Sequence, residues 1–264
     1  MTTAARGALV RQITVSVAYV VCLAGSLVGV GVFGGTPIAE AADGLLSADA
    51  THLAPASSAF SVWTAIYIAL GAYTVWQWWD RTDERRIAWL IVASLVLNAG
   101  WILSVQAGSV GSSVAVIVAL LAVLAETFRR LLRVPPRSWV EAVAADGTVG
   151  LYLGWVSVAT CANIAAALLG AGFTGGDRPE LWAVGVLAVV AAVGVALAVV
   201  GRGRLAVAAT LVWGLTWIAV ARATGEPESM TTAIAAGAAA AVIAVVTIIC
   251  RLRAGIRSRQ EAST

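Results

Sequence analysis

Eight long apolar runs constrain this chain more than any other feature of its sequence. A helix that crosses a bilayer needs about 20 apolar residues, because each residue advances about 1.5 Å along the helix axis. Only 12% of the residues are charged, about half the share of a typical soluble domain, so the charges cannot cover a globular surface in water. We therefore predict an all-α fold, an integral membrane helix bundle of about eight transmembrane helices. The predicted helices are Gln12–Gly34, Ser58–Trp79, Arg86–Gln106, Val110–Leu132, Thr148–Gly170, Leu181–Val200, Leu205–Ala223 and Met230–Cys250.

The arginines predict the orientation in the membrane. All 17 basic residues are Arg, and 15 of them lie before the first run, after the eighth, or in every second loop between, the adjoining ends of the runs included. The opposite loops hold only Arg178 and Arg222. Because cytoplasmic loops collect Arg, we predict a multi-pass protein of the bacterial cytoplasmic (inner) membrane with both termini in the cytoplasm. Topology thus explains the net charge of +3, and no nucleic-acid partner is predicted.

The first run has an alternative interpretation as a cleaved signal peptide, with Ala39-Glu40-Ala41 as the cleavage site. The run is longer than a signal-peptide core of about 7–15 apolar residues. Its glycines also suit close packing against another helix. We therefore predict that the first run is a retained helix of the bundle.

Enzyme and metal chemistry find no support in the sequence. There is no P-loop, no GxGxxG after a strand and no HExxH. The single histidine, His52, lies in a polar loop and is expected to be solvated. Because no cysteine has metal-ligand or disulfide-framework spacing, we predict free thiols and no metal site. Because the enzyme motifs are missing, we predict no catalytic residue and no enzymatic activity. The cysteines are Cys22, Cys161 and Cys250.

Two amide side chains, Asn98 and Asn163, lie inside predicted helices, where an unpaired polar group is costly. Counting along the helices places both amides, with Trp63 and Trp101, about 7–12 Å below the outer membrane boundary. Two interpretations stay open. The amides hold helices together and the tryptophans anchor the interface, or these groups line a pocket in the outer half of the bundle.

Helical spacing places aromatic and amide groups on common helix faces. Trp63 and Tyr67 are four residues apart, and Asn98 and Trp101 are three apart. Three helices therefore present aromatic and amide groups at one depth, as the wall of a pocket would. The third of these faces combines Trp155, Ala159 and Asn163.

Four pieces of the sequence, in this order, resemble the TspO/MBR family, the tryptophan-rich sensory proteins related to the peripheral benzodiazepine receptor. They are the glycine-rich first helix, "FSVWTAIYIALGAYTVW" (Phe60–Trp76), "LVLNAGW" (Leu95–Trp101) and "LYLGWVSVATCAN" (Leu151–Asn163). The resemblance covers roughly Gln12–Gly172. It implies a TspO-like five-helix bundle over residues 1–172, and leaves residues 173–264 as an additional three-helix segment with a basic cytoplasmic tail. The ligand-binding positions that it implies are Trp63, Tyr67, Asn98, Trp101, Trp155, Ala159, Thr160 and Asn163.

The same resemblance implies a function. Members of the family bind tetrapyrroles in a cavity of the bundle, and in animals they bind cholesterol and synthetic drugs. This chain departs from the family pattern before its second helix, where it has "LAPASS" in place of WxPP. Its fifth helix lacks the cholesterol-type pattern, so cholesterol binding is not carried over to this chain. We predict a sensor, carrier or scavenger of a flat hydrophobic ligand of the porphyrin class. No cofactor is required, and a porphyrin or haem-like molecule is the expected ligand. An enzyme that modifies a bound tetrapyrrole is the third alternative, ranked last because no residue supplies acid–base or metal chemistry.

The alternative function is a small secondary transporter of a hydrophobic metabolite, whose three additional helices would supply the moving half. No predicted helix carries a mid-membrane charge for ion coupling and none is broken by Pro, so we favour the binding protein. The predicted partners are a small hydrophobic ligand and the lipid bilayer. The small-residue stripes Gly25–Gly29 and Ala235–Ala239 would also permit a homodimer.

Overall fold

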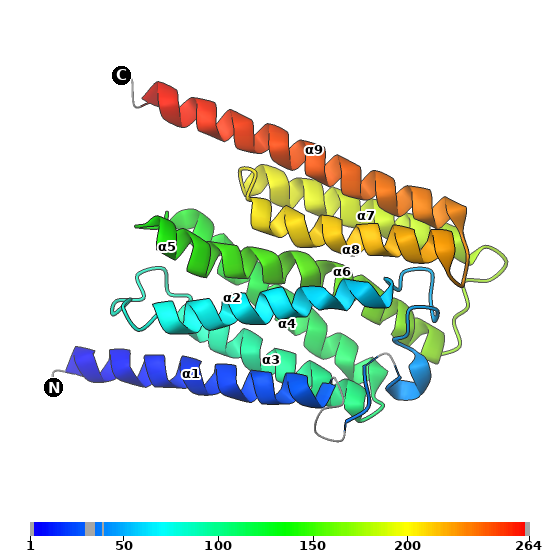
Figure 1. Ribbon diagram of the computed structural model, residues 1–264, viewed down its shortest axis with the longest axis horizontal. Coiled ribbons are helices and arrows are strands. Elements are labelled where there is room, and N and C mark those ends of the chain that lie inside the picture. Colours follow the sequence, from blue (N-terminus) through cyan, green and yellow to red (C-terminus); the bar gives the residue numbers. More distant parts are fainter. Residues whose placement is uncertain (1–2, 30–34, 39, 262–264) are drawn as a thin grey trace. The chain divides into compact units, whose positions relative to one another are not determined.

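The computed structural model describes residues 3–29, 35–38 and 40–261, and all regular structure in this part of the chain is helical. Eight of the described helices are long and apolar enough to cross a membrane, which confirms the predicted fold class (Figure 1). Gly34, the predicted end of the first helix, and Ala39, from the signal-peptide alternative, lie outside the described residues. The long helices are α1 (Thr3–Gly29), α2 (Val62–Trp76), α3 (Ala88–Gln106), α4 (Val110–Arg133), α6 (Thr148–Gly170), α7 (Pro179–Val200), α8 (Leu205–Thr224) and α9 (Met230–Glu261).

The fifth membrane-spanning segment begins earlier than predicted. The sequence placed its start at Thr148, whereas the apolar span runs over Trp139–Gly170. A short helix, α5 (Trp139–Glu141), and one π-helical stretch, η3 (Ala142–Gly147), lead directly into α6. Such π-helical turns are rare and occur mostly as single-turn insertions within α-helices.

The chain forms two packing units, each described here by itself. Unit 1 comprises Met1–Ser47 and Ser61–Val149, and unit 2 comprises Ala48–Phe60 and Gly150–Thr264. The predicted boundary at residue 172 rests on the family's five-helix pattern and stays a prediction.

In unit 1, α3 packs against both α1 and α4, and α2 contacts α1 and η3 (Figure 1). Apolar residues that recur every three or four positions face this core; on α4 the buried residues include Ile117, Leu120 and Leu124. Gly25 brings α1 close to α3, since a Cβ at this position would lie 3.5 Å from the Cβ of Ala99. Gly25 of the predicted dimerisation stripe thus serves packing within the chain, and the homodimer itself stays a prediction.

Buried ion pairs join η3 to the loop between α2 and α3. Arg85 binds both carboxylate oxygens of Asp146, over 2.6 and 2.8 Å, and lies 3.4 Å from Glu141. It also donates to the carbonyl of Leu131 over 3.0 Å. Because these carboxylates are paired, acidic residues can stand in the continuous segment that leads into α6. Arg85 was interpreted from the sequence as a topology-setting loop charge, and its buried pairing is a new finding.

In unit 2, α9 packs against α7 and α8 (Figure 1). Helix α8 packs against α6, where the Thr210 hydroxyl donates to the carbonyl of Leu151 over 2.8 Å. Gly154 makes this approach possible, because a Cβ there would overlap the Thr210 hydroxyl and the carbonyl of Val207. The buried side chains of α7, α8 and α9 are predominantly Leu, Val, Ile and Ala, as expected of membrane helices.

Candidate ligand-binding site

Three of the predicted aromatic residues form a stack in unit 1. The rings of Trp63 and Tyr67 are stacked with centroids 5.5 Å apart and an interplanar angle of 20°. Trp63 also stacks with Trp101 on α3, at 6.3 Å and 27°. The spacing of four residues on α2 thus produces the predicted pair, and α3 supplies a third ring. Trp63 and Tyr67 are half-buried, so each retains accessible ring surface.

Asn98 completes this arrangement, and its side chain is fully buried. Its amide nitrogen donates to the Tyr67 hydroxyl over 3.0 Å and contacts the sulfur of Cys22 at 3.3 Å. Its carbonyl oxygen is buried and has no hydrogen-bond partner among the described residues. We call Trp63, Tyr67, Asn98 and Trp101 the aromatic–amide cluster. It offers flat ring surfaces beside one unused acceptor, which can orient a polar edge of a ligand.

Helix α1 also contacts the aromatic–amide cluster. The Tyr19 hydroxyl donates to the backbone carbonyl of Tyr67 over 3.0 Å. This contact requires a glycine one turn further along α2, because a Cβ at Gly71 would lie 2.6 Å from the Tyr19 hydroxyl oxygen. The position of the Tyr67 ring is therefore fixed by its backbone contact as well as by the Asn98 amide.

The other four predicted residues lie on α6, within unit 2. Trp155 is buried and meets Phe60 edge-on, with centroids 5.8 Å apart and rings at 80°. Thr160 donates its hydroxyl to the carbonyl of Val156 over 2.7 Å, so its proton is used within its own helix. Asn163 is buried and Ala159 is half-buried. The structure brings the four residues of unit 1 together; the participation of the α6 residues in the same pocket stays a prediction.

Charged groups in the loops before α3 and α5 are paired or hydrogen-bonded. Hydrogen bonds to Asp80 and Glu141 raise the pKa of Arg137 above its usual range, over N–O distances of 2.8 and 3.0 Å. Burial raises the pKa of Asp83, although the backbone N–H of Ile87 donates to it over 3.0 Å. These paired and capping roles are structural.

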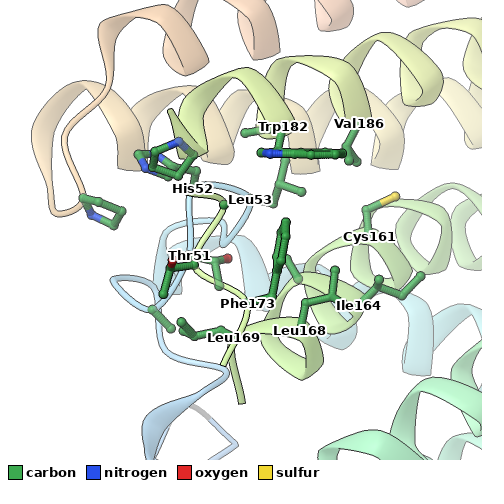
Figure 2. Close-up of a pocket in the computed structure, with 17 residues that line it drawn as sticks. Thr51, His52, Leu53, Cys161, Ile164, Leu168, Leu169, Phe173, Trp182 and Val186 are labelled. Carbon is green, nitrogen blue, oxygen red and sulfur yellow. The ribbon is translucent and has the colours of Figure 1, made fainter. Parts of the chain in front are cut away.

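A separate cavity of about 380 Å³ lies in unit 2 (Figure 2). Its walls come from α6, from the start of α7 and from loop segments that include Thr51 and His52. None of the eight predicted site residues lines it. The expectation that His52 is solvated was wrong for its Nδ1 atom, which is buried without a hydrogen-bond partner among the described residues. Sequence periodicity gave no signal for this cavity, because its walls are ordinary apolar residues from distant segments.

Eight described helices that are long and apolar enough to cross a membrane define the class as a multi-pass membrane protein. The model of the TSPO-like protein family matches residues 12–249, which is most of the chain. The protein belongs to this family. The match continues through α7, α8 and into α9, beyond the five helices covered by the motif resemblance. No curated protein and no solved structure matches the chain.

Proposed function

We propose that this TSPO-like membrane protein binds a flat hydrophobic ligand of the porphyrin class and acts as its sensor, carrier or scavenger. The observation that carries the proposal is the aromatic–amide cluster of unit 1. The stacked rings of Trp63, Tyr67 and Trp101 suit the face of a flat aromatic molecule. The unused carbonyl oxygen of Asn98 suits a ring N–H or other donor at its edge.

We also propose that the protein resides in a bacterial cytoplasmic membrane with both termini in the cytoplasm. The support is the distribution of charge, with 15 of the 17 arginines on one side of the predicted topology. Fusions at the C-terminus test this orientation. A green fluorescent protein fused there should fluoresce, and an alkaline phosphatase fused there should be inactive.

The binding proposal is tested by titrating the detergent-purified protein with protoporphyrin IX, following tryptophan quenching and the Soret band. Two variants probe the cluster, Trp63→Phe and Asn98→Ala. A matched control is Trp89→Phe at the start of α3, because this tryptophan is exposed and lies outside the cluster. We expect saturable binding in the wild type and in the control, and weakening of about 5- to 100-fold in each cluster variant, as expected for one lost stacking or hydrogen-bonding group.

Two outcomes would contradict the proposal. Quenching that stays linear with porphyrin concentration would mean partitioning into the micelle. Saturable binding that both cluster variants leave unchanged would place the porphyrin elsewhere on the protein. The first result would favour the alternative, a small secondary transporter of a hydrophobic metabolite, which a flux assay in proteoliposomes would then test. The second result would exclude the aromatic–amide cluster as the binding site.

A further inference from the structure

The cavity of unit 2 has the features of a binding site in its own right. It is lined by 17 residues, and all of them belong to unit 2. Its volume of about 380 Å³ lies near the lower end of ligand pockets, which span about 300–1,000 Å³. A space of this size suits a molecule with one or two rings better than a large macrocycle.

The body of the cavity is apolar and partly aromatic. Ile164 and Leu168 of α6 form one wall, and Trp182 and Val186 of α7 form another (Figure 2). The ring of Phe173 points toward that of Trp182, with centroids 5.7 Å apart and an angle of 80° between the rings. Edge-to-face rings of this kind offer both a flat surface and a ring edge to an aromatic guest.

One end of the cavity is polar. Thr51 and His52 lie on the side away from Cys161 (Figure 2). The Thr51 hydroxyl oxygen and the His52 Nδ1 are both buried, and neither has a hydrogen-bond partner among the described residues. Buried polar atoms in proteins are almost always paired. A small rotation of either side chain toward the cavity would let a bound molecule supply the missing partner.

The polar end is held in place by Arg222 of α8, whose side chain is 1% exposed. Its guanidinium donates to the carbonyl of Ala48 over 2.6 Å and to the carbonyl of Pro227 over 3.0 Å. The segment after Ala48 is fixed a second time where the N–H of Ala56 donates to the carbonyl of Trp217 over 3.2 Å. Thr51 and His52 therefore stand on a segment that is anchored at both ends, which is the preorganisation that a binding site needs.

We propose that this cavity binds a compact hydrophobic molecule that has one or two aromatic rings and a single hydroxyl group. The rings pack between Phe173, Trp182 and the apolar walls. The hydroxyl donates to the imidazole of His52 and accepts from the hydroxyl of Thr51, so that both polar residues gain a partner. This second site is independent of the aromatic–amide cluster and does not rest on the function proposed above.

Cys161 provides a reporter inside the cavity. It is a free, partly accessible thiol that lines the wall opposite the polar end (Figure 2). In a Cys22→Ala, Cys250→Ala background it is the single cysteine of the chain. The experiment measures its rate of alkylation by N-ethylmaleimide in the full-length, detergent-purified protein. The probe is 1-naphthol, and naphthalene, which lacks the hydroxyl, is the matched control molecule.

We expect 1-naphthol to slow the alkylation of Cys161 in a saturable way. Naphthalene should bind about 3- to 10-fold more weakly, as expected for the loss of one hydrogen-bonding group. His52→Leu should reduce this difference between the two probes, because only the hydrogen bond with Thr51 remains. Ala183→Phe should abolish protection by filling the cavity, because Ala183 is a buried lining residue. Ala188→Phe, on an exposed position of the same helix, should leave protection intact.

Three results would overturn the proposal. Equal protection by both probes in the wild type would mean that an apolar space accepts any hydrophobic molecule, including a lipid or detergent chain. Protection that survives Ala183→Phe in a variant with native circular dichroism would place the probe outside the cavity. Loss of protection in a folded Asn98→Ala variant would show that the two sites are one. The Asn98→Ala variant also distinguishes the two proposals. If the sites are separate, loss of porphyrin binding in this variant should leave the protection of Cys161 by 1-naphthol unchanged.

Discussion

Asn98 on α3 donates its side-chain amide to the hydroxyl of Tyr67 on α2 across 3.0 Å, in a position where the amide is fully buried. This bond joins two helices that are separated by a charged loop, and it fixes the ring on which Trp63 stacks. The same two residues therefore link the packing of unit 1 to the shape of the aromatic–amide cluster.

Removal of the Tyr67 hydroxyl should cost stability without loss of the fold. For Tyr67→Phe we expect a loss of about 0.5–1.5 kcal/mol, the usual range for one hydrogen bond between membrane helices. Unfolding with sodium dodecyl sulfate, followed by circular dichroism, measures the change. Ile68→Val on the same helix is the control, because Ile68 is exposed and its side chain carries no hydrogen-bonding group. Equal losses in the two variants would contradict the assigned bond.

Replacement of Arg85 should have a larger effect. Arg85→Ala leaves the carboxylates of Asp146 and Glu141 without this cation, and a broken buried ion pair costs about 3–5 kcal/mol. The exposed Arg129 pairs with Glu126 over 2.6 Å, and Arg129→Ala should leave the unfolding midpoint almost unchanged, since exposed pairs contribute little. Thermal unfolding of the two variants side by side tests this difference. Similar midpoints would mean that the Arg85 pairs are not essential to the fold.

The contact between α6 and α8 should be sensitive to a single methyl group. Gly154→Ala places a Cβ into the Thr210 hydroxyl and the Val207 carbonyl, and overpacking of this kind costs about 1–3 kcal/mol. Gly237→Ala on α9 meets open space and should be neutral or stabilising by up to about 1 kcal/mol, as for an ordinary helical Gly. Unfolding in detergent measures both. If Gly154→Ala matched Gly237→Ala, the close approach of the two helices would be disproved.

The stability of the protein should depend on pH through His52. Burial, with Arg222 nearby, lowers the pKa of His52 below its ordinary 6.5, while Glu180 acts in the opposite direction. The unfolded chain therefore binds the proton more readily, so stability is present above pH 6.5 and is lost as the pH falls below it. Between about pH 7.5 and about pH 5, the midpoint of wild-type thermal unfolding should fall further than that of His52→Gln. Parallel curves would show that His52 does not titrate differently in the folded protein.

Hydropathy was sufficient to predict the eight spans, because an apolar run of about 20 residues has few alternatives to a membrane helix. The spacing of residues along a helix was sufficient to predict the stack of Trp63 on Tyr67, since a separation of four residues places both side chains on one helix face. The start of the fifth span was not predictable from hydropathy. Asp146 and Glu141 belong there because Arg85, far away in the sequence, pairs with both, and because Arg137 pairs with Glu141 as well.

The cavity of unit 2 could not have been predicted from the sequence. Periodicity shows which residues share a face of a helix, but not which faces meet or where they leave space. Its apolar walls combine Leu168 of α6 with Val186 of α7, which are common residues in any membrane helix. Its polar end depends on His52. The position of His52 in a polar loop predicted solvation, whereas its Nδ1 atom is buried.

Arg222 is one of two arginines that oppose the charge asymmetry of the chain, and it is also the residue that binds the carbonyls of Ala48 and Pro227. The first role acts during membrane insertion, and the second acts in the folded protein. During insertion, a positive charge at this position works against the orientation proposed above. After folding, the same charge is enclosed by backbone carbonyls. A replacement by Met should therefore ease insertion in that orientation while it loosens the finished protein, so this one side chain has opposite effects on biogenesis and on the folded state.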